Sequence, residues 1–122
     1  MQRLELSTQA DGALESAAKA LLAGGVAIFP TDTVYGIGAL PQHSAALNRI
    51  YKLKDRPLGM PLPLLISDIA QVRTVSSFES ESLHLLAKAF WPGPLTFVLP
   101  DASTASNSFV AQDGTIAVRS PD

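Results

Sequence analysis

The 122-residue sequence contains no cysteine, only two histidines and no long apolar run. Without cysteine the chain has no disulfide framework, no thiolate zinc or iron–sulfur site and no cysteine nucleophile. His43 and His84 are too few for a His-rich site, so we expect no metal centre. No apolar run approaches the roughly 18–20 residues of a bilayer span. The stretch Met1–Glu5 also lacks the apolar core of a signal peptide. These absences predict a cytoplasmic protein without a membrane partner.

Charge is sparse and nearly balanced, with nine basic residues against eleven acidic ones and a net charge of -2. That balance excludes a strongly basic nucleic-acid binder, although it leaves a local basic patch open. Hydrophobic residues make up 47% of the chain and charged residues 16%, which excludes a disordered segment. A chain of this length buries roughly two-thirds of its unfolded surface. We therefore predict a single domain over residues 1–122.

Helical periodicity alternates with short apolar runs along the sequence. The pattern predicts helices over about 10–23 and 44–54 and a third that ends at Trp91, with strands over 26–29, 62–66, 95–99 and 115–119. Ser67–Asp68 offers an N-cap to a further short helix. This alternation is typical of an α/β sheet covered on its faces. The helical residues expected to face the core are Leu14, Ala17, Ala18, Leu21 and Leu22, then Ala46, Leu47, Ile50 and Tyr51, then Leu83, Leu86, Ala87 and Phe90.

The segment Pro30–Gly38 follows the first predicted strand and combines short polar side chains with two glycines. In open α/β sheets ligands bind beyond the carboxyl ends of strands. Thr31, Asp32 and Thr33 therefore suit a small polar substrate. The alternative is a simple turn in which threonine and aspartate side chains bond local amides. The residues alone leave both interpretations open.

The segment Lys54–Pro57 carries two cations two residues apart. Pro57 favours an extended Arg56, and an extended Lys54 would then point to the same side. Such a pair could clamp a polyphosphate. The alternative, which the residues alone favour, is that Lys52 and Lys54 complement a helix C-terminus. There is no Walker-type loop, so any ATP would be held differently.

The predicted strand Thr115–Arg119 has two different faces. Alternation places Thr115, Ala117 and Arg119 on one face and Ile116 and Val118 on the other. A hydroxyl and a guanidinium on one face could bind a carboxylate or a nucleotide. Without further information a solvated strand face is the better interpretation. Neither His43 nor His84 has an evident partner.

Four segments in register resemble the YrdC-like family, the threonylcarbamoyl-AMP synthases. They are Gly24–Gly36, Ile50–Pro57, Trp91–Thr96 and Thr115–Arg119. The resemblance covers nearly the whole chain and implies a three-layer α/β fold with a twisted mixed sheet. A Ser-x-Asn signature that follows in the family is absent. We therefore expect the N-terminal two-thirds of the usual domain, with an unpaired sheet edge near 115–119.

The resemblance also implies a reaction. ATP, L-threonine and bicarbonate would give threonylcarbamoyl-AMP and pyrophosphate, with ATP as a substrate accompanied by Mg²⁺ and no permanent cofactor. A tRNA-modifying transferase would act downstream as a partner, and weak RNA binding is compatible with the family. Two alternatives remain: a carbamoyl-adenylate-forming module, and a non-catalytic RNA-binding relative of the same fold.

Site residues follow from the resemblance position by position. Thr31, Thr33 and Arg119 match positions that bind L-threonine. Lys54 and Arg56 match the basic pair that faces the ATP phosphates and assists catalysis.

Two further positions, Met60 and Thr115, match nucleotide contacts. Met60 stands where the family often has a polar residue, and Leu65 stands where some members have a histidine that touches threonine. No residue stands out as the general base.

Overall fold

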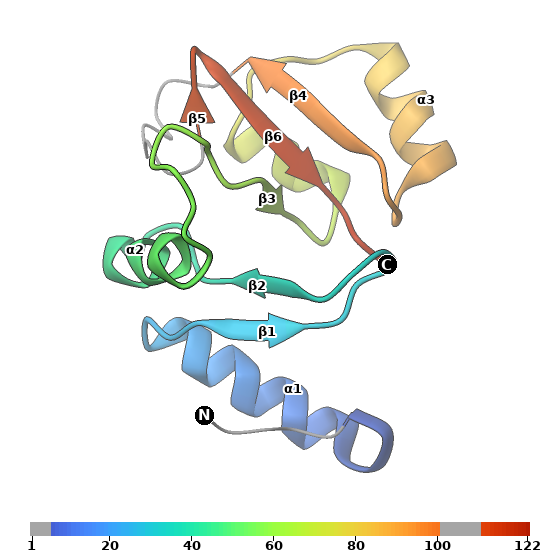
Figure 1. Cartoon of the computed structure of the whole chain (residues 1–122). Coiled ribbons are helices and arrows are strands. Elements are labelled where there is room, and N and C mark those ends of the chain that lie inside the picture. Colours follow the sequence, from blue (N-terminus) through green and yellow to red (C-terminus); the bar gives the residue numbers. More distant parts are fainter. Residues whose placement is uncertain (1–5, 101–110) are drawn as a thin grey trace. The chain divides into compact units, whose positions relative to one another are not determined.

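The computed structural model describes residues 6–100 and 111–122 (Figure 1). The chain forms two compact units, and each combines separate stretches of sequence. Unit 1 comprises Met1–Phe29 and Gly36–Asp55, and unit 2 comprises Pro30–Tyr35 and Arg56–Asp122. The one-domain organisation over residues 1–122 stays a prediction.

Unit 1 contains helix α1 (Leu6–Leu22), strands β1 (Ala27–Phe29) and β2 (Gly36–Gly38), and helix α2 (Ser44–Leu53). The strands pair antiparallel, with Phe29 opposite Gly36. Residues 36–38 were expected in a loop, and that expectation is wrong. Both glycines of β2 lie under the Phe29 ring, where an added Cβ would come within 3.0 Å of it. This close ring contact explains why both positions are glycine.

Helix α2 agrees with the sequence pattern, whereas α1 departs from it. The α2 residues predicted to face the core are all buried: Ala46, Leu47, Ile50 and Tyr51. Helix α1 begins earlier than expected, and Leu14 and Leu22 are 59% and 67% exposed. Its predicted apolar stripe is therefore wrong in part, because a two-stranded ribbon offers little surface to cover a helix of 17 residues. Helix α1 ends just before a glycine pair, and Gly24 has a φ of +81°, which glycine adopts without strain.

Unit 2 is built around strand β6 (Thr115–Arg119). The other elements are β3 (Leu64–Leu65), the 3₁₀ helix η1 (Ile69–Thr74), α3 (Glu81–Phe90), β4 (Thr96–Pro100) and β5 (Ala111–Gln112). Strand β4 pairs antiparallel along the whole of β6. On the opposite edge, β5 pairs with the start of β6 and β3 runs parallel to its end. The expected unpaired edge near 115–119 is therefore wrong, while the predicted mixed sheet is confirmed (Figure 1).

The core of unit 2 lies on one face of this sheet. Ile116 and Val118 are 1% and 0% exposed and pack with buried residues of η1, α3 and β4. This confirms the alternation predicted for β6. Helix α3 contributes fewer residues than expected, because Leu86 and Phe90 are 44% and 53% exposed. Leu83 and Ala87, one turn apart, are its buried residues, so a single row of side chains meets the core.

The predicted N-cap of unit 2 is confirmed. Asp68 caps η1 by accepting a hydrogen bond from the backbone N–H of Ala70 at 2.6 Å. After α3, the indole N–H of Trp91 donates to the Leu95 carbonyl at 2.7 Å, and its ring lies edge-on to Phe97. These contacts anchor the turn that follows α3. None of the described helices is long and apolar enough to cross a bilayer.

Candidate functional site

Arg119, at the end of β6, is the centre of a polar cluster in unit 2. Its Nη2 donates to Asp32 Oδ1 at 2.6 Å, and Nη1 and Nη2 each lie 3.3 Å from Thr33 Oγ1. Thr31 Oγ1 lies 3.2 Å from Thr33 Oγ1. We call Thr31, Asp32, Thr33 and Arg119 the Thr–Arg cluster. The structure thus brings together all three residues that were expected to hold the amino acid.

The hydroxyl groups of this cluster have a fixed hydrogen-bond direction. Thr31 donates its only hydroxyl hydrogen to the Val34 carbonyl at 2.6 Å. Thr31 Oγ1 must therefore accept from Thr33, which leaves Thr33 Oγ1 to accept from Arg119. Thr33 consequently presents lone pairs, not a hydrogen, toward the guanidinium. In this arrangement Thr33 can accept a hydrogen bond from a substrate amine.

One edge of the Arg119 guanidinium is occupied by protein oxygens. Nε donates to the Gly93 carbonyl at 2.9 Å, and Nη2 donates to Asp32. The Gly93 N–H in turn donates to the Ser120 carbonyl at 2.8 Å, which ties the turn after α3 to the end of β6. Nη1 and Nη2 form the other edge, whose contacts among the described residues are the long ones to Thr33. A ligand carboxylate would meet this second edge.

Asp32 is ionised and held from two directions. Its Oδ1 accepts from Arg119 and from the Asp122 backbone N–H at 3.2 Å, and its own N–H donates to the Asp122 carbonyl at 3.1 Å. Desolvation alone would raise the pKa of Asp32, but the Arg119 and Asp122 hydrogen bonds and the Arg119 charge together hold this pKa below its ordinary value of 3.8. The Asp32–Arg119 ion pair is therefore intact at neutral pH.

Arg119 lies on the face of the sheet opposite the core of unit 2, together with two other predicted positions. Leu65 of β3 is the register partner of Arg119 in β6, and Leu65 is 42% exposed. Thr115 lies at the other end of β6 on the same face. The face therefore carries an apolar side chain beside the guanidinium and a hydroxyl further along the strand. The roles of these residues stay predictions.

The basic pair does not have the geometry that its spacing suggested. Lys54 is the C-cap of α2 with φ −97° and ψ −1°, so it is not extended. Asp55 follows with a φ of 47°, and the two-residue alternation of a strand does not apply. Arg56 belongs to unit 2, where its Nε and Nη2 donate to the carbonyls of Met60 and Pro61, both at 2.9 Å. Arg56 and Met60 are thus in contact through a backbone carbonyl, and their nucleotide roles stay predictions.

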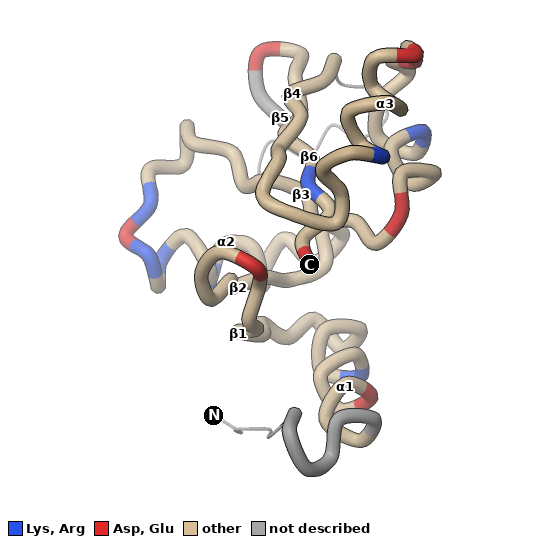
Figure 2. Tube along the Cα trace, turned by 90° about the vertical axis from the view of Figure 1, so that its right-hand side faces the viewer, with Lys and Arg blue, Asp and Glu red and all other residues tan. Residues whose placement is uncertain are grey.

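Basic residues do not gather into one block along the chain. Figure 2 shows them separated by acidic and uncharged stretches, and the segment that follows α2 carries basic residues on both sides of an acidic one. Across residues 6–100 and 111–122, no group of three histidine, aspartate or glutamate side chains could hold a metal ion.

Both histidines have partners, contrary to expectation. His43 is the N-cap residue of α2, and its Nε2 lies 3.2 Å from the Leu22 carbonyl. The His84 ring bonds to Glu79, which also pairs with Arg73 at 3.3 Å. Residue spacing carries no signal for either contact, because neither Leu22 nor Glu79 lies in the same helix as its histidine. Neither histidine belongs to the Thr–Arg cluster.

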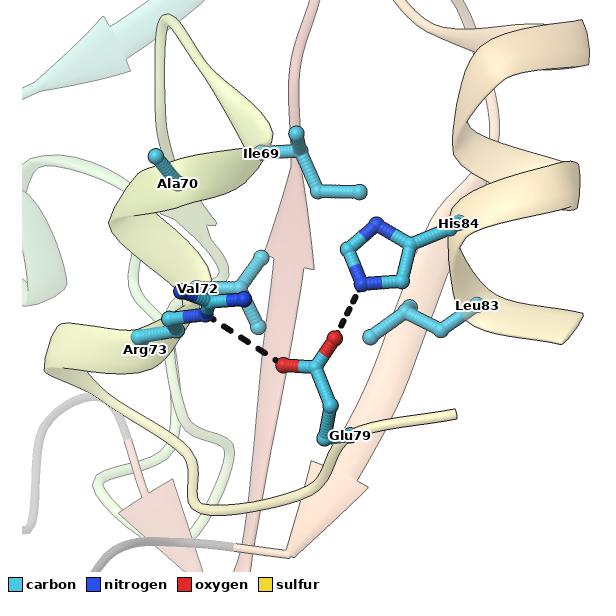
Figure 3. A pocket seen from close by; sticks show the side chains of 7 residues that line it. All are labelled: Ile69, Ala70, Val72, Arg73, Glu79, Leu83 and His84. Carbon is cyan, nitrogen blue, oxygen red and sulfur yellow. Dashed lines mark hydrogen bonds and ion pairs between the residues drawn. The ribbon is translucent and has the colours of Figure 1, made fainter. Parts of the chain in front are cut away.

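A shallow hollow of about 170 Å³ lies between η1 and α3 (Figure 3). Its lining includes Val72 and Leu83 of the core, with Arg73, Glu79 and His84 at the rim. The hollow therefore lies on the covered side of the sheet, whereas Arg119 lies on the other face. Its charged groups already satisfy one another, so we do not assign it to the site.

The Glu79 contacts predict a local pH dependence. Bonding to His84 and Arg73 outweighs desolvation and holds the pKa of Glu79 below its ordinary value of 4.5. A carboxyl whose pKa is lowered in the folded state stabilises it above the unfolded value, and that contribution is lost as pH falls through the folded pKa. Glu79→Gln should therefore lower the melting temperature at pH 6 but leave it unchanged near pH 2. An equal loss at both pH values would contradict this assignment.

The comparisons with known proteins agree with this fold. Residues 19–122 match the sequence family Sua5_yciO_yrdC, described as "Telomere recombination". The chain belongs to this family. Among solved Sua5/YciO/YrdC structures, Pyrococcus abyssi Sua5 complexed with L-threonine superposes with a TM-score of 0.84 and 36% identity. That alignment covers 98% of this chain and 34% of the Sua5 chain. Escherichia coli YciO gives a TM-score of 0.77 at 25% identity, over 89% of this chain and 53% of its own.

Two curated relatives within the Sua5/YciO/YrdC family carry the name threonylcarbamoyl-AMP synthase. The Bacillus subtilis protein is 41% identical over 119 residues, which is 97% of this chain and 34% of that protein. The Vibrio vulnificus protein is 35% identical over 111 residues, which is 89% of this chain and 60% of that protein. The chain thus spans about a third to three-fifths of the length of these relatives. The predicted family and the α/β fold are confirmed.

Sequence reasoning missed two members of the site. Asp32 was recognised only as a short polar residue, and the Gly93 carbonyl was not considered. Their contacts with Arg119 span 87 and 26 residues of sequence. A carboxylate flanked by two threonines was the only local signal, and it did not identify the cation that would pair with it.

Proposed function

We propose that the protein is an L-threonylcarbamoyladenylate synthase and that the Thr–Arg cluster holds the amino acid. The observation that carries this proposal is the direct contact between Arg119 and Thr33, with Thr31 ordering the hydroxyl of Thr33. The likeness to a Sua5 structure complexed with L-threonine supports it. A guanidinium matches a carboxylate, and a threonine hydroxyl that presents lone pairs matches an amine.

The proposed reaction joins three substrates. The threonine amine attacks bicarbonate to form a carbamate with loss of water. A carbamate oxygen then attacks the α-phosphorus of ATP, and pyrophosphate leaves. Lys54 and Arg56 offset the charge of the phosphates, while Met60 and Thr115 contact the nucleotide. Mg²⁺ would arrive with ATP and be held chiefly by the phosphates, since the described part of the chain offers no three-ligand cluster. A tRNA-modifying transferase would consume the product.

Pyrophosphate release from ATP tests the proposal in the full-length protein. We expect release that requires both L-threonine and bicarbonate. Nucleotide binding without any threonine-dependent release would instead favour a non-catalytic RNA-binding relative. Activity with a carbamoyl donor in place of threonine and bicarbonate would indicate carbamoyl-adenylate chemistry.

Removing Lys54 should slow adenylation more than it weakens threonine binding. We expect Lys54→Ala to lower kcat by about a hundredfold, because charge at the phosphates is lost from the transition state. Lys52→Ala, two residues earlier in the last turn of α2, is the matched control and should retain activity. Arg56→Ala should also lower kcat, and it would additionally release the carbonyls of Met60 and Pro61. Normal pyrophosphate release with poor threonine saturation in either variant would show that the two sub-sites are exchanged.

A further inference from the structure

Asp32 is the one member of the Thr–Arg cluster to which the proposed reaction assigns no role. It nevertheless makes the shortest contact to Arg119, at 2.6 Å, and both side chains are only 16% exposed. An ion pair that is largely withdrawn from solvent is costly to break by removing one partner, because the other charge is left uncompensated. Asp32 therefore restrains the position of the Arg119 guanidinium more strongly than either threonine does.

The contact also determines which part of the guanidinium remains for a ligand. Asp32 and the Gly93 carbonyl occupy the edge formed by Nε and Nη2. That edge is the one with which arginine often binds a carboxylate through two parallel bonds. Because the Nε–Nη2 edge is filled, a ligand must approach from the Nη1 side. There Nη1 makes the long contact to Thr33 and has a second N–H for which none of the described residues is an acceptor. While the bonds to Gly93 and Asp32 hold, the guanidinium group cannot turn its Nε–Nη2 edge toward a ligand.

The anchoring of Asp32 explains how it can resist displacement. The N–H and C=O of Asp122 bond to the Asp32 carboxylate and N–H respectively, at 3.2 and 3.1 Å. The carboxylate is thus fixed by backbone that follows directly from β6, the strand that ends in Arg119. An incoming carboxylate would have to break an ion pair and these bonds to take the place of Asp32.

We propose that Asp32 is a positioning residue of the amino-acid site, which fixes the Arg119 guanidinium so that only its Nη1 side is offered to a substrate carboxylate. This inference rests on the proposed function, in which Arg119 binds that carboxylate. Asp32 acts through Arg119 and does not itself touch the substrate. The opposite arrangement, in which Asp32 competes with the substrate for Arg119, predicts the opposite sign when Asp32 is removed.

Dissociation constants for L-threonine and for ATP in the full-length protein test the proposal. Asp32→Ala should weaken L-threonine binding by at least about tenfold, as expected when a hydrogen bond to a charged group is lost. Asp32→Asn keeps an acceptor for Nη2 without the charge, so its loss should be smaller. ATP binding should change less than about twofold in both variants, a separation that general structural damage would not produce. Asp113→Asn is the matched control: it makes the same charge change in unit 2, at a φ of 52° that asparagine tolerates.

Each outcome either supports or overturns the positioning role of Asp32. Unchanged or tighter L-threonine binding in Asp32→Asn would overturn the inference, and tighter binding would identify Asp32 as a competitor. Equal weakening of L-threonine and ATP would assign Asp32 a purely structural role and would also overturn it. Wild-type protein that binds no L-threonine would overturn the proposed function and this inference with it. Should Asp32→Ala fail to fold, the comparison of Asp32→Asn with Asp113→Asn carries the test.

Discussion

Arg119→Lys should weaken L-threonine binding sharply while leaving most of unit 2 folded. Lysine keeps the positive charge but lacks the planar set of donors that reaches Gly93, Asp32 and Thr33 together. Loss of charge-assisted hydrogen bonds of this kind costs on the order of 1.5–3 kcal/mol each. We therefore expect a loss of threonine affinity of at least about tenfold, measured by calorimetry on the full-length protein.

Arg73→Lys provides the matched control for this substitution. Arg73 lies in the same unit but on the covered side of the sheet, where its side chain is 72% exposed and pairs with Glu79. Its replacement should leave threonine affinity unchanged. Equal affinities in wild type and Arg119→Lys would remove Arg119 from the amino-acid site.

Ile116→Ala should destabilise the protein by about 2–5 kcal/mol, the usual range for emptying a fully buried aliphatic position. Ile116 is 1% exposed and packs among Val72, Leu83 and Leu99, which come from three different elements. These neighbours are fixed by strand pairing and helix caps, so they cannot collapse readily into the space. Urea unfolding measured by circular dichroism would give the change in the free energy of unfolding.

Val98→Ala on the adjacent strand is the control, because Val98 is 67% exposed on the other face of the sheet. Its effect should stay within about 0.5 kcal/mol. Similar losses from both substitutions would mean that the two faces of the sheet are equally covered, contrary to the burial described above.

The parts of the fold that could be predicted are those set by local periodicity. The buried face of α2 and the alternation of Ile116 and Val118 follow from helical and strand repeats, and both are confirmed. The outward position of Leu14 and Leu86 could not be predicted, because periodicity identifies an apolar face without showing whether another element covers it. The 36–38 strand was missed since glycines weaken strand propensity, and the ring that stabilises it is on a different strand.

The site shows the same division. The resemblance placed Thr31, Thr33 and Arg119 in one group, and the structure brings them together in one unit. It did not reveal the Asp32–Arg119 ion pair, which joins residues 87 positions apart. The expectation that Lys54 and Arg56 share one side relied on strand geometry, and the αR conformation of Lys54 removes that basis. Long-range pairing and the conformation of individual loop residues are the two properties that residue spacing does not encode.

The interleaving of the two units constrains how this protein can be dissected. The chain crosses from one unit to the other after Phe29, after Tyr35 and after Asp55. A single truncation point therefore cannot yield either unit by itself, since Pro30–Tyr35 of unit 2 separates the two segments of unit 1, and Gly36–Asp55 of unit 1 separates the two segments of unit 2. The Pro30–Tyr35 loop carries Thr31, Asp32 and Thr33, so a split point or deletion next to it would separate these residues from Arg119, which Asp32 and Thr33 contact. Isolating one unit requires its two segments to be joined directly, as when a short linker replaces Gly36–Asp55 to leave unit 2 alone.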